Sequence, residues 1–416
     1  MNLYRRHLEK TVVDQLGNRR ALFILGTRRV GKTSLLKRVQ DKINEEKTLY
    51  FDLENLNTLA LFKRGIDTFM NWFDAQGYPK DKRFILFLDE IQYLDEFSNF
   101  VKLAVDHHSD RMKLILSGSS AAQIKYKFRD SLAGRKFVYT LYPLTFREFL
   151  IFKNESRMVD LLGGDKNSVQ HESLAFFHDK LKSLYSEFLL FGGYPEVALT
   201  DSQKDKVNIL EELIHSYVLR DIRNLFTIEH IDAFNKLTQI IAIQSGQLFN
   251  SQSISKEIGI DYRTVNKYLQ ILSDTFIVSL LKPLFTNKKR ELKKMPKVYL
   301  LDTGIRNMLL SNFNPINLRT DRGELLESGV FSALWKRLNT LETLYYWRTR
   351  DGKEVDFVLQ KGVDYIPFEV KKKKTAVNHL LAFSVLYDSP ERNLVRFDEE
   401  KIGQKGKVSI VYPWYL

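Results

Sequence analysis

A loop near the start of the chain has the residue spacing of a phosphate-binding loop. Residues 26–33 read Gly-Thr-Arg-Arg-Val-Gly-Lys-Thr and match G-x-x-x-x-G-K-[ST] without a mismatch. In such a loop the backbone N–H groups face phosphate oxygens, the lysine reaches the β- and γ-phosphates, and the threonine hydroxyl holds Mg²⁺. We therefore predict that ATP and Mg²⁺ bind here, with Lys32 also catalytic and Thr33 a metal ligand. The predicted nucleotide-binding residues are Gly26, Thr27, Arg28, Arg29, Val30, Gly31, Lys32, Thr33 and Ser34.

Two acidic residues follow an apolar segment further along the chain. Residues 84–88 read Phe-Ile-Leu-Phe-Leu, which is typical of a buried strand, and Asp89 and Glu90 come directly after them. In this Walker B arrangement Asp89 would help to hold the nucleotide's Mg²⁺, and Glu90 would position and deprotonate the attacking water. An ordinary strand with an acidic end is the alternative. The loop upstream favours ATP hydrolysis.

Smaller signals could complete this site. Residues 113–116 predict another strand, and a serine hydroxyl after it could contact the γ-phosphate or the attacking water. Ser117 is our first candidate and Ser119 the second. An arginine that reaches the γ-phosphate, in the same chain or from a neighbouring subunit, would stabilise charge in the transition state. Arg135 is the first candidate and Arg129 the second, and a solvated surface arginine is the ordinary alternative for both.

A second set of candidate residues lies in the last hundred residues. Three strands are predicted between residues 343 and 371. On the last of them Glu369 and Lys371 point to one side, because side chains alternate along a strand, and Asp356 on the neighbouring strand could meet them. Two carboxylates and a lysine on one sheet face can bind Mg²⁺, activate a water and stabilise a pentavalent phosphate.

This pattern resembles the core of the PD-(D/E)XK nucleases. The resemblance implies that Asp356 and Glu369 are metal ligands and that Lys371 orients or activates water. It also implies a further metal ligand, Glu327, on the helix predicted before the strands. Acid-x-Lys on a strand is common by chance, and the lysines from residue 371 onwards could be a solvated basic run. Asp356, Glu369 and Lys371 are the predicted catalytic residues.

The middle of the chain predicts a winged helix-turn-helix. Residues 253–258 and 262–272 predict two short helices, with Asp261 placed to cap the second. Residues 276–281 and 297–301 predict two strands joined by a basic tip. Such a unit binds DNA, although winged helices also serve as protein-docking modules. The predicted DNA contacts are Arg263, Thr264, Asn266, Lys267, Lys288, Lys289 and Arg290.

The composition is compatible with a DNA partner but does not identify DNA as the partner. The chain has 416 residues and a formal net charge of +13, which favours a polyanionic partner, nucleic acid before membrane. It has no cysteine, which excludes disulfides, cysteine-based zinc sites and a cysteine nucleophile. No apolar stretch reaches the length of a membrane span, and no apolar segment of a signal peptide follows Met1. We expect a cytoplasmic protein with no membrane partner.

These residues need particular elements to position them. The loop and the acidic pair need a parallel α/β sheet, because the carboxyl ends of its strands meet at one edge. Apolar runs at residues 21–25, 50–53 and 137–139 predict three more strands, and apolar residues at helical spacing predict a connector or lid of helices. We divide the chain into a P-loop domain, a helical connector, a winged helix and an α/β nuclease-like domain, at residues 1–150, 151–245, 246–312 and 313–416.

Several segments resemble the prokaryotic AAA-type ATPases of the archaeal-ATPase group, which carry a C-terminal DUF4143 domain. This resemblance implies an ASCE-type P-loop fold, related to the AAA+ and STAND switch ATPases. The segments that carry it are residues 26–33, 84–90, 116–120, 132–135, 141–149, 191–195 and 217–222.

Two hypotheses of different classes follow. The leading hypothesis is a Mg²⁺-dependent ATPase whose nucleotide state controls a DNA-binding C-terminal half with a nuclease-like domain that cleaves DNA. The alternative is a STAND-like, ATP-driven switch or scaffold, with a protein-binding winged helix and an inactive nuclease fold. The presence of Asp356, Glu369 and Lys371 favours the first, because a degenerate domain would often have lost one of them. A homo-oligomer is compatible with both.

Overall fold

The computed structural model of the chain has two compact units. The first comprises Met1–Tyr142 with Asp274–Phe276, and the second comprises Pro143–Ser273 with Ile277–Leu416. The boundary predicted at residue 150 therefore lies inside the second unit. No helix within the described segments is long and apolar enough to cross a membrane. The structure describes residues 3–43, 47–119, 132–163, 176–216, 228–284, 295–349, 351–371, 377–387, 389, 391–398, 403–405 and 408–416.

The first unit is built on a five-stranded parallel sheet with the order β2-β3-β4-β1-β5. Because neighbouring strands are parallel, their carboxyl ends meet at one edge, where open α/β sheets bind ligands. β4 lies between β1 and β3, so the end of β4 stands between the loop after β1 and the acidic pair at the end of β3. The strands are β1 (Ala21–Leu25), β2 (Lys47–Asp52), β3 (Phe84–Asp89), β4 (Met112–Gly118) and β5 (Lys136–Thr140).

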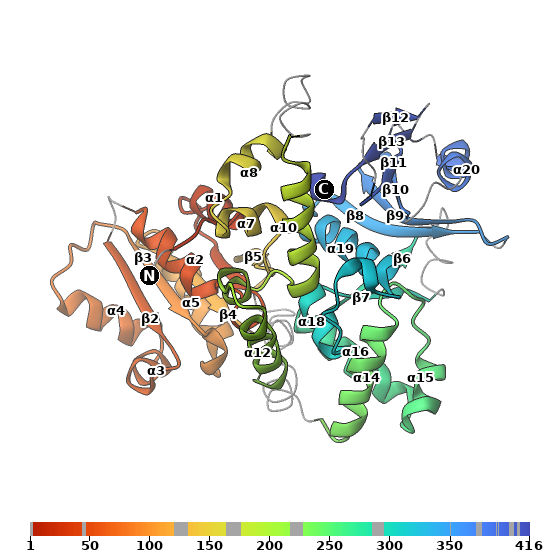
Figure 1. Cartoon of the computed structure of the whole chain (residues 1–416). Coiled ribbons are helices and arrows are strands. Elements are labelled where there is room, and N and C mark those ends of the chain that lie inside the picture. The colour runs from red at the N-terminus through yellow and green to blue at the C-terminus, as the bar shows by residue number, and fades with distance from the viewer. Residues whose placement is uncertain are drawn as a thin grey trace. The chain divides into compact units, whose positions relative to one another are not determined.

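Helices cover both faces of this sheet (Figure 1). They are α1 (Leu8–Asp14), α2 (Lys32–Asp41), α3 (Leu56–Lys63), α4 (Ile66–Ala75) and α5 (Phe97–His108). On one face Leu36 of α2 shares an apolar cluster with Phe87 of β3. On the other face the ring of Phe73 of α4 lies 4.2 Å from that of Phe84. Phe84 and Phe87 face opposite sides because strand side chains alternate. The predicted parallel α/β fold is confirmed for this unit.

The helices of the second unit share a core across two of the predicted domains. They are α7 (Phe146–Phe152), α8 (Ser156–Gly163), α10 (His178–Phe191), α11 (Pro195–Leu199), α12 (Gln203–Leu213), α14 (Ile231–Ile243), α15 (Ser251–Ile258), α16 (Tyr262–Asp274), α18 (Thr303–Leu309), α19 (Arg322–Lys336) and α20 (Asn378–Tyr387). Leu210 of α12, Phe234 of α14 and Val265 of α16 belong to one buried apolar cluster. The helices on either side of the boundary predicted at residue 245 therefore pack together.

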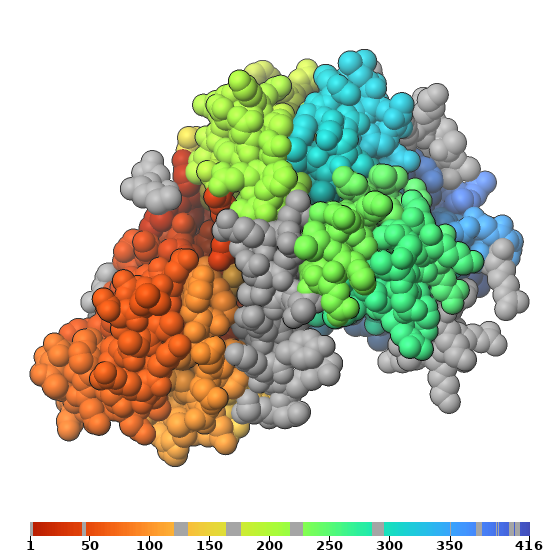
Figure 2. Space-filling view, turned by 90° about the horizontal axis from the view of Figure 1, so that it is seen from below, coloured from red at the N-terminus to blue at the C-terminus, as the bar shows by residue number. Residues whose placement is uncertain are grey.

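The two short helices predicted at residues 253–258 and 262–272 are present as α15 and α16. The side chain of Asn250 accepts N–H groups of the first turn of α15, and Gly259, with φ +81°, ends that helix. Asp261 accepts the N–H of Arg263 (2.8 Å) at the start of α16. α14 and α15 lie side by side on the surface of this unit, in green in Figure 2. The buried stripe of α16 has helical spacing and consists of Val265, Tyr268, Leu269, Ile271 and Leu272.

An eight-stranded sheet forms the rest of the second unit, in the order β12-β13-β11-β10-β9-β8-β6-β7. β6 pairs in parallel with β8 through Lys282 and Tyr345. The hairpin β6–β7 and the predicted nuclease-like strands therefore belong to one sheet, and the boundary predicted at residue 312 falls between its strands. The strands are β6 (Val278–Pro283), β7 (Lys297–Leu300), β8 (Glu342–Arg348), β9 (Glu354–Lys361), β10 (Asp364–Val370), β11 (Asn393–Val395), β12 (Gly403–Lys405) and β13 (Val408–Val411).

Two helices flank the centre of this sheet (Figure 1). The ring of Phe357 of β9 lies 6.1 Å from that of Phe331 of α19. Val358, the next residue of β9, belongs to a buried apolar cluster with Phe383 of α20. Since consecutive side chains of a strand point to opposite faces, α19 and α20 cover opposite faces. The strands that carry the acidic residues are thus held between two layers of helix.

The Gly-Gly-Tyr-Pro segment after α10 has a structural explanation. Asp302, at the start of α18, is buried and accepts the N–H groups of Gly193 (2.8 Å) and Ile305 (3.1 Å). Gly192 has φ +78°, and a Cβ atom on it would lie 2.1 Å from Asp302 Oδ1. Burial raises the pKa of Asp302, while Lys336 and the N–H donors act in the opposite direction. Gly192 is therefore required where α10 meets the start of α18.

Candidate functional site

The loop after β1 contains two positions that only glycine fits. Gly31 has φ +96°, in the left-handed region, and stands directly before α2. A Cβ atom on Gly26 would lie 2.2 Å from the carbonyl oxygen of Leu141. The loop leads to the N-terminus of α2, where unpaired N–H groups and the helix dipole favour an anion. Its backbone therefore suits phosphate binding.

Lys32 is a buried cation next to this loop. It is 5% exposed, and its Nζ donates to the carbonyl oxygens of Gly26 (3.2 Å) and Thr27 (3.0 Å). Burial lowers the pKa of Lys32, and the negative charges of Glu90 and Asp89 act in the opposite direction. Phosphate oxygens would stabilise the charged form of a buried ammonium group. Lys32 and the loop N–H groups thus fit a nucleoside triphosphate.

Asp89, the last residue of β3, accepts hydrogen bonds from three hydroxyl groups. Thr33 (2.5 Å) and Tyr50 (2.6 Å) donate to its Oδ2, and Ser117 donates to its Oδ1. Burial and the bond to Asp89 raise the pKa of Tyr50, so the phenol remains a donor. Carboxylate and hydroxyl oxygens suit Mg²⁺, and Thr33 and Asp89 lie together as such a site requires. Sequence reasoning did not find Tyr50, because its place beside Asp89 depends on the order of the strands.

Glu90 is held by a side chain that the sequence did not single out. It has φ +56°, a strained conformation for a residue with a side chain. Gln92, in the 3₁₀ helix η1 (Ile91–Tyr93), donates through Nε2 to Glu90 Oε2 and to the hydroxyl of Ser119 (3.0 Å). The structure therefore connects Ser119 to Glu90 and Ser117 to Asp89. Ser119, the second candidate, thus shares a hydrogen-bond donor with Glu90, whereas Ser117, the first candidate, donates to Asp89.

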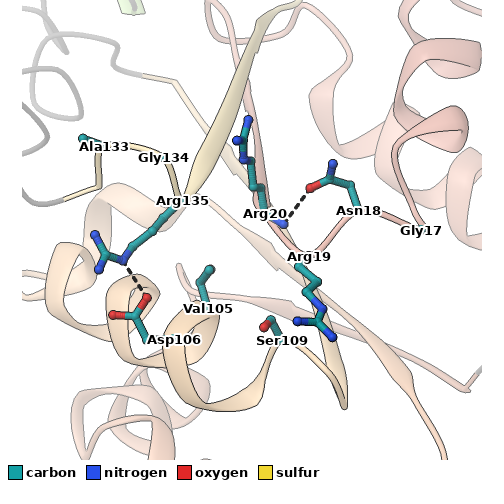
Figure 3. A pocket seen from close by; sticks show the side chains of 10 residues that line it. All are labelled: Gly17, Asn18, Arg19, Arg20, Val105, Asp106, Ser109, Ala133, Gly134 and Arg135. Carbon is teal, nitrogen blue, oxygen red and sulfur yellow. Dashed lines mark hydrogen bonds and ion pairs between the residues drawn. The ribbon is translucent and has the colours of Figure 1, made fainter.

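Arg135 lies at the opposite edge of the sheet from the phosphate-binding loop. It directly precedes β5, whose first residue pairs with the first residue of β1, whereas the loop follows the last residue of β1. Its guanidinium forms an ion pair with Asp106 (2.6 Å), in a pocket of about 770 Å³ that Arg19 and Arg20 also line (Figure 3). The prediction that Arg135 reaches the γ-phosphate of its own chain is wrong, because the length of β1 separates them. Its action on a neighbouring subunit stays a prediction, and Arg129 lies outside the described residues.

The catalytic residues predicted in the second unit meet at β9 and β10. Asp356 sits at a β-bulge, where β9 has one residue more than β8, a feature often found beside active sites. Its Oδ2 accepts the N–H of Val370 (2.8 Å), and Oε1 of Glu369 accepts a hydrogen bond from Nζ of Lys371 (2.7 Å). Two adjacent strands thus bring Asp356, Glu369 and Lys371 together.

Burial changes the acidity of these carboxyl groups. It raises the pKa of Asp356 to about 7, with a further contribution from Glu369. It also raises the pKa of Glu327 to about 7, with a further contribution from Asp356, and it raises the pKa of Glu369 against the opposing effect of Lys371. Neighbouring carboxylates disfavour one another's charge, so a cation in this place would stabilise the ionised forms.

The predicted metal set of Glu327, Asp356 and Glu369 does not form in the structure. Within the described part of the chain, no group of three or more Asp, Glu or His side chains is arranged to hold a metal ion. The physical reason is that Oε1 of Glu327 already accepts hydrogen bonds from the hydroxyl of Tyr299 (2.6 Å) and from Nζ of Lys297 (3.4 Å). Asp356 and Glu369 therefore remain as a pair. Mg²⁺ often uses only one or two protein carboxylates together with water and substrate phosphate, so this pair still fits the ion.

Lys297, Tyr299 and Glu354 are members of this cluster that sequence reasoning missed. Lys297 is 5% exposed, and its Nζ lies 2.7 Å from Oε1 of Glu354. The nearby carboxylates Glu327, Asp356 and Glu354 raise the pKa of Lys297, although burial alone would lower it. The one available signal was a lysine at the start of a strand whose other residues are Val298, Tyr299 and Leu300, all of them buried.

The DNA contacts predicted on α16 lie on its accessible side. The exposed residues are Arg263, Asn266 and Lys267, and Thr264 is half-buried. Nζ of Lys267 lies 3.7 Å from Oε1 of Glu229, a contact that solvent weakens. The contacts predicted in the basic tip lie outside the described residues and are Lys288, Lys289 and Arg290.

Three family models match successive parts of the chain. Residues 18–150 match a model described as AAA domain, which covers the phosphate-binding loop and the acidic pair. The first unit is thus an AAA-type, P-loop ATPase-like domain. Residues 322–415 match a model described as domain of unknown function DUF4143, and residues 182–315 match another, DUF8612. The chain is an AAA-domain protein with a C-terminal DUF4143 domain, and the resemblance seen in the sequence is confirmed.

Similar proteins match most of the chain. An uncharacterized protein of Haemophilus influenzae is 25% identical over 376 residues, which cover 86% of this chain and 85% of the relative. One of Methanocaldococcus jannaschii is 28% identical over 346 residues, which cover 81% of this chain and 71% of the relative. The solved structure of a Walker-type ATPase of Pyrococcus abyssi is 15% identical, covers 74% of this chain and 96% of that chain, and has a TM-score of 0.50. This likeness supports the fold.

Proposed function

We propose that the first unit hydrolyses ATP with Mg²⁺. Lys32 and the loop N–H groups would bind the phosphates, Thr33 and Asp89 would hold the cation, and Glu90 would take the proton of the attacking water. The bound cation would neutralise charge on the phosphate oxygens. The hydrogen bond from Thr33 to Asp89 (2.5 Å) carries this proposal, because it joins the phosphate-binding loop to the acidic pair at one point.

We further propose that the nucleotide state of the first unit controls a second unit that binds DNA and carries a nuclease-like site. α15, α16 and the hairpin β6–β7 follow one another in the order of a winged helix, and the exposed side of α16 is basic. The meeting of Asp356, Glu369 and Lys371 supports a site for phosphodiester chemistry. The net charge of +13 suits a polyanionic partner.

Replacing Arg263 and Lys267 together by alanine should weaken binding to duplex DNA. If each side chain contacts a phosphate, the slope of log affinity against log salt should fall by about 2, since each lost contact removes about 0.9. The measurement is a salt titration of fluorescence anisotropy with a labelled duplex. Lys80→Ala with Lys204→Ala removes the same charge from exposed positions elsewhere and should leave the slope unchanged. No DNA binding by the wild type at low salt would contradict the DNA-binding proposal.

The wild type should cleave plasmid or oligonucleotide DNA with Mg²⁺ or Mn²⁺, at a rate that depends on ATP. Asp356→Ala with Lys371→Ala should abolish cleavage, because it removes a metal ligand and the ammonium group beside Glu369. Asp364→Ala with Lys361→Ala is the matched control, since it makes the same charge change at exposed positions of the same sheet. Equal cleavage by the Asp356–Lys371 variant and the wild type would identify a contaminating nuclease and contradict the assignment.

A switch or scaffold is the second candidate function, and one observation favours it. Lys297 contacts two carboxylates of the cluster, and the three-carboxylate metal set expected from the sequence is not formed among the described residues. A nuclease fold with these contacts could be inactive, with the winged helix binding protein in place of DNA. Intact ATP hydrolysis without cleavage under any condition would favour this function.

A further inference from the structure

The starting point is a buried lysine that the proposed function does not use. Lys297 opens β7, the strand next to β6, and its Nζ lies 2.7 Å from Glu354 and 3.4 Å from Glu327. Tyr299, two residues later on the same strand, donates to the same oxygen of Glu327 (2.6 Å). A buried ammonium group is costly unless carboxylates surround it. Both carboxylates are therefore engaged before any metal ion arrives.

The other two carboxylates of the cluster have oxygen atoms left for a ligand. Asp356 accepts the N–H of Val370 through Oδ2, and Glu369 is paired with Lys371 through Oε1. Oε2 of Glu369 is buried and has no hydrogen-bond partner among the described residues. Buried polar atoms normally have a partner, so we expect a bound ligand to contact this oxygen. It belongs to a side chain that is 3% exposed and lies next to Asp356.

The formal charges of the cluster also indicate that it binds a cation. The carboxylates of Glu327, Glu354, Asp356 and Glu369, set against the ammonium groups of Lys297 and Lys371 and the Arg348 guanidinium 3.6 Å from Glu354, leave a formal charge of −1. A single divalent cation is enough to offset that charge. Two-metal sites place their ions about 3.5–4 Å apart and need carboxylate ligands on both. A second ion would need Glu327 and Glu354, where the ammonium group of Lys297 already stands.

We infer that Lys297 takes the place of a second cation, so that this site binds a single divalent ion through Asp356 and Glu369. Lys297 is then a positioning residue, since it acts by holding Glu327 and Glu354. The inference rests on the proposed nuclease-like function of the same site. It also predicts that removing the charge of Lys297, with its carbon chain kept, frees two carboxylates for a second ion.

The test counts bound Mn²⁺ by the electron paramagnetic resonance of the free ion, on the full chain without nucleotide. The wild type should bind one Mn²⁺ more than Asp356→Asn. Ions bound at other sites, including the one at Thr33, are present in both proteins and cancel in this difference. Lys297→Met should bind two ions more than Asp356→Asn. Lys361→Met, which removes an exposed lysine 3.8 Å from Glu342, should bind one, like the wild type. Circular dichroism establishes that each variant is folded.

The outcomes separate the inference from the proposed function. Two ions in the wild type would overturn the inference and leave the nuclease-like function standing, and this count needs no Lys297 variant. A folded Lys297→Met protein that binds one ion with wild-type affinity would overturn the role of Lys297 alone. No Mn²⁺ difference between wild type and Asp356→Asn would overturn both the inference and the metal-dependent function.

Discussion

Replacing Glu90 by glutamine should lower the rate of ATP hydrolysis by about 10²–10⁴-fold, the usual contribution of a general base. ATP binding should persist, because the phosphate contacts come from Lys32 and the loop at the N-terminus of α2. Glutamine has nearly the size of glutamate and still reaches Gln92, so the turn after β3 should keep its shape. The measurements are the rate of phosphate release and the affinity for a fluorescent ATP analogue.

The control for this variant is Glu96→Gln, in the same unit. Glu96 is exposed, and its side chain makes no cap hydrogen bond at the start of α5. Its hydrolysis rate should equal that of the wild type. If Glu90→Gln hydrolysed ATP as fast as Glu96→Gln, Glu90 would not be the base, and the assignment of the acidic pair would have to be abandoned.

Replacing Asp302 by alanine should destabilise the second unit by about 3 kcal/mol. The change removes the helix cap of α18 and leaves the buried N–H of Gly193 without its acceptor, losses worth about 1 and 1–3 kcal/mol. With about 2–4 °C per kcal/mol for a unit of this size, the midpoint of its thermal transition should fall by about 6–12 °C. Tryptophan fluorescence suits the measurement, because the second unit contains Trp335, Trp347 and Trp414.

A second helix cap provides the comparison for Asp302. Ser202 caps α12 through the N–H of Asp205 (3.4 Å) at an exposed position. Since water can replace the lost bond there, Ser202→Ala should cost about 1 kcal/mol or less. A shift for Asp302→Ala no larger than that for Ser202→Ala would show that the contact with Gly193 contributes little to stability.

The residues of the first unit that the sequence predicted best are those whose signal is local. The spacing of Gly26, Gly31 and Lys32 reflects the shape of one loop, and Asp89 and Glu90 end one apolar strand. Their partners could not be predicted in this way. Tyr50 reaches Asp89 only because β2 lies beside β3, and the place of Arg135 depends on where β5 begins. The order of strands is a property of the whole sheet, and no single residue of the sequence indicates it.

In the second unit, too, contacts between distant segments could not be predicted from local sequence patterns. Some of its elements, such as α15, α16 and the strands β8–β10, could be predicted from the sequence, but β11–β13 and the division into domains could not. The pairing of Lys282 with Tyr345 joins strands that are distant along the chain, and a cluster that includes Phe191 and Val265 joins helices across a predicted boundary. The contacts of Lys297 also join elements that are distant along the chain. A lysine between apolar residues gives no sign of which carboxylates a distant strand and helix will bring to it.

The parallel pairing of β6 with β8 has a practical consequence for anyone who shortens this protein. A fragment that begins at residue 313, as the sequence alone would suggest, lacks β6 and β7 and leaves β8 as an open edge strand. An uncovered edge with residues such as Tyr346 and Trp347 invites pairing between molecules and therefore aggregation. The same fragment would also lose Lys297 and Tyr299, so Glu327 would lose both of its hydrogen-bond donors and Glu354 its contact with the Lys297 ammonium group. An insoluble or inactive fragment would therefore say nothing about the activity of the whole chain.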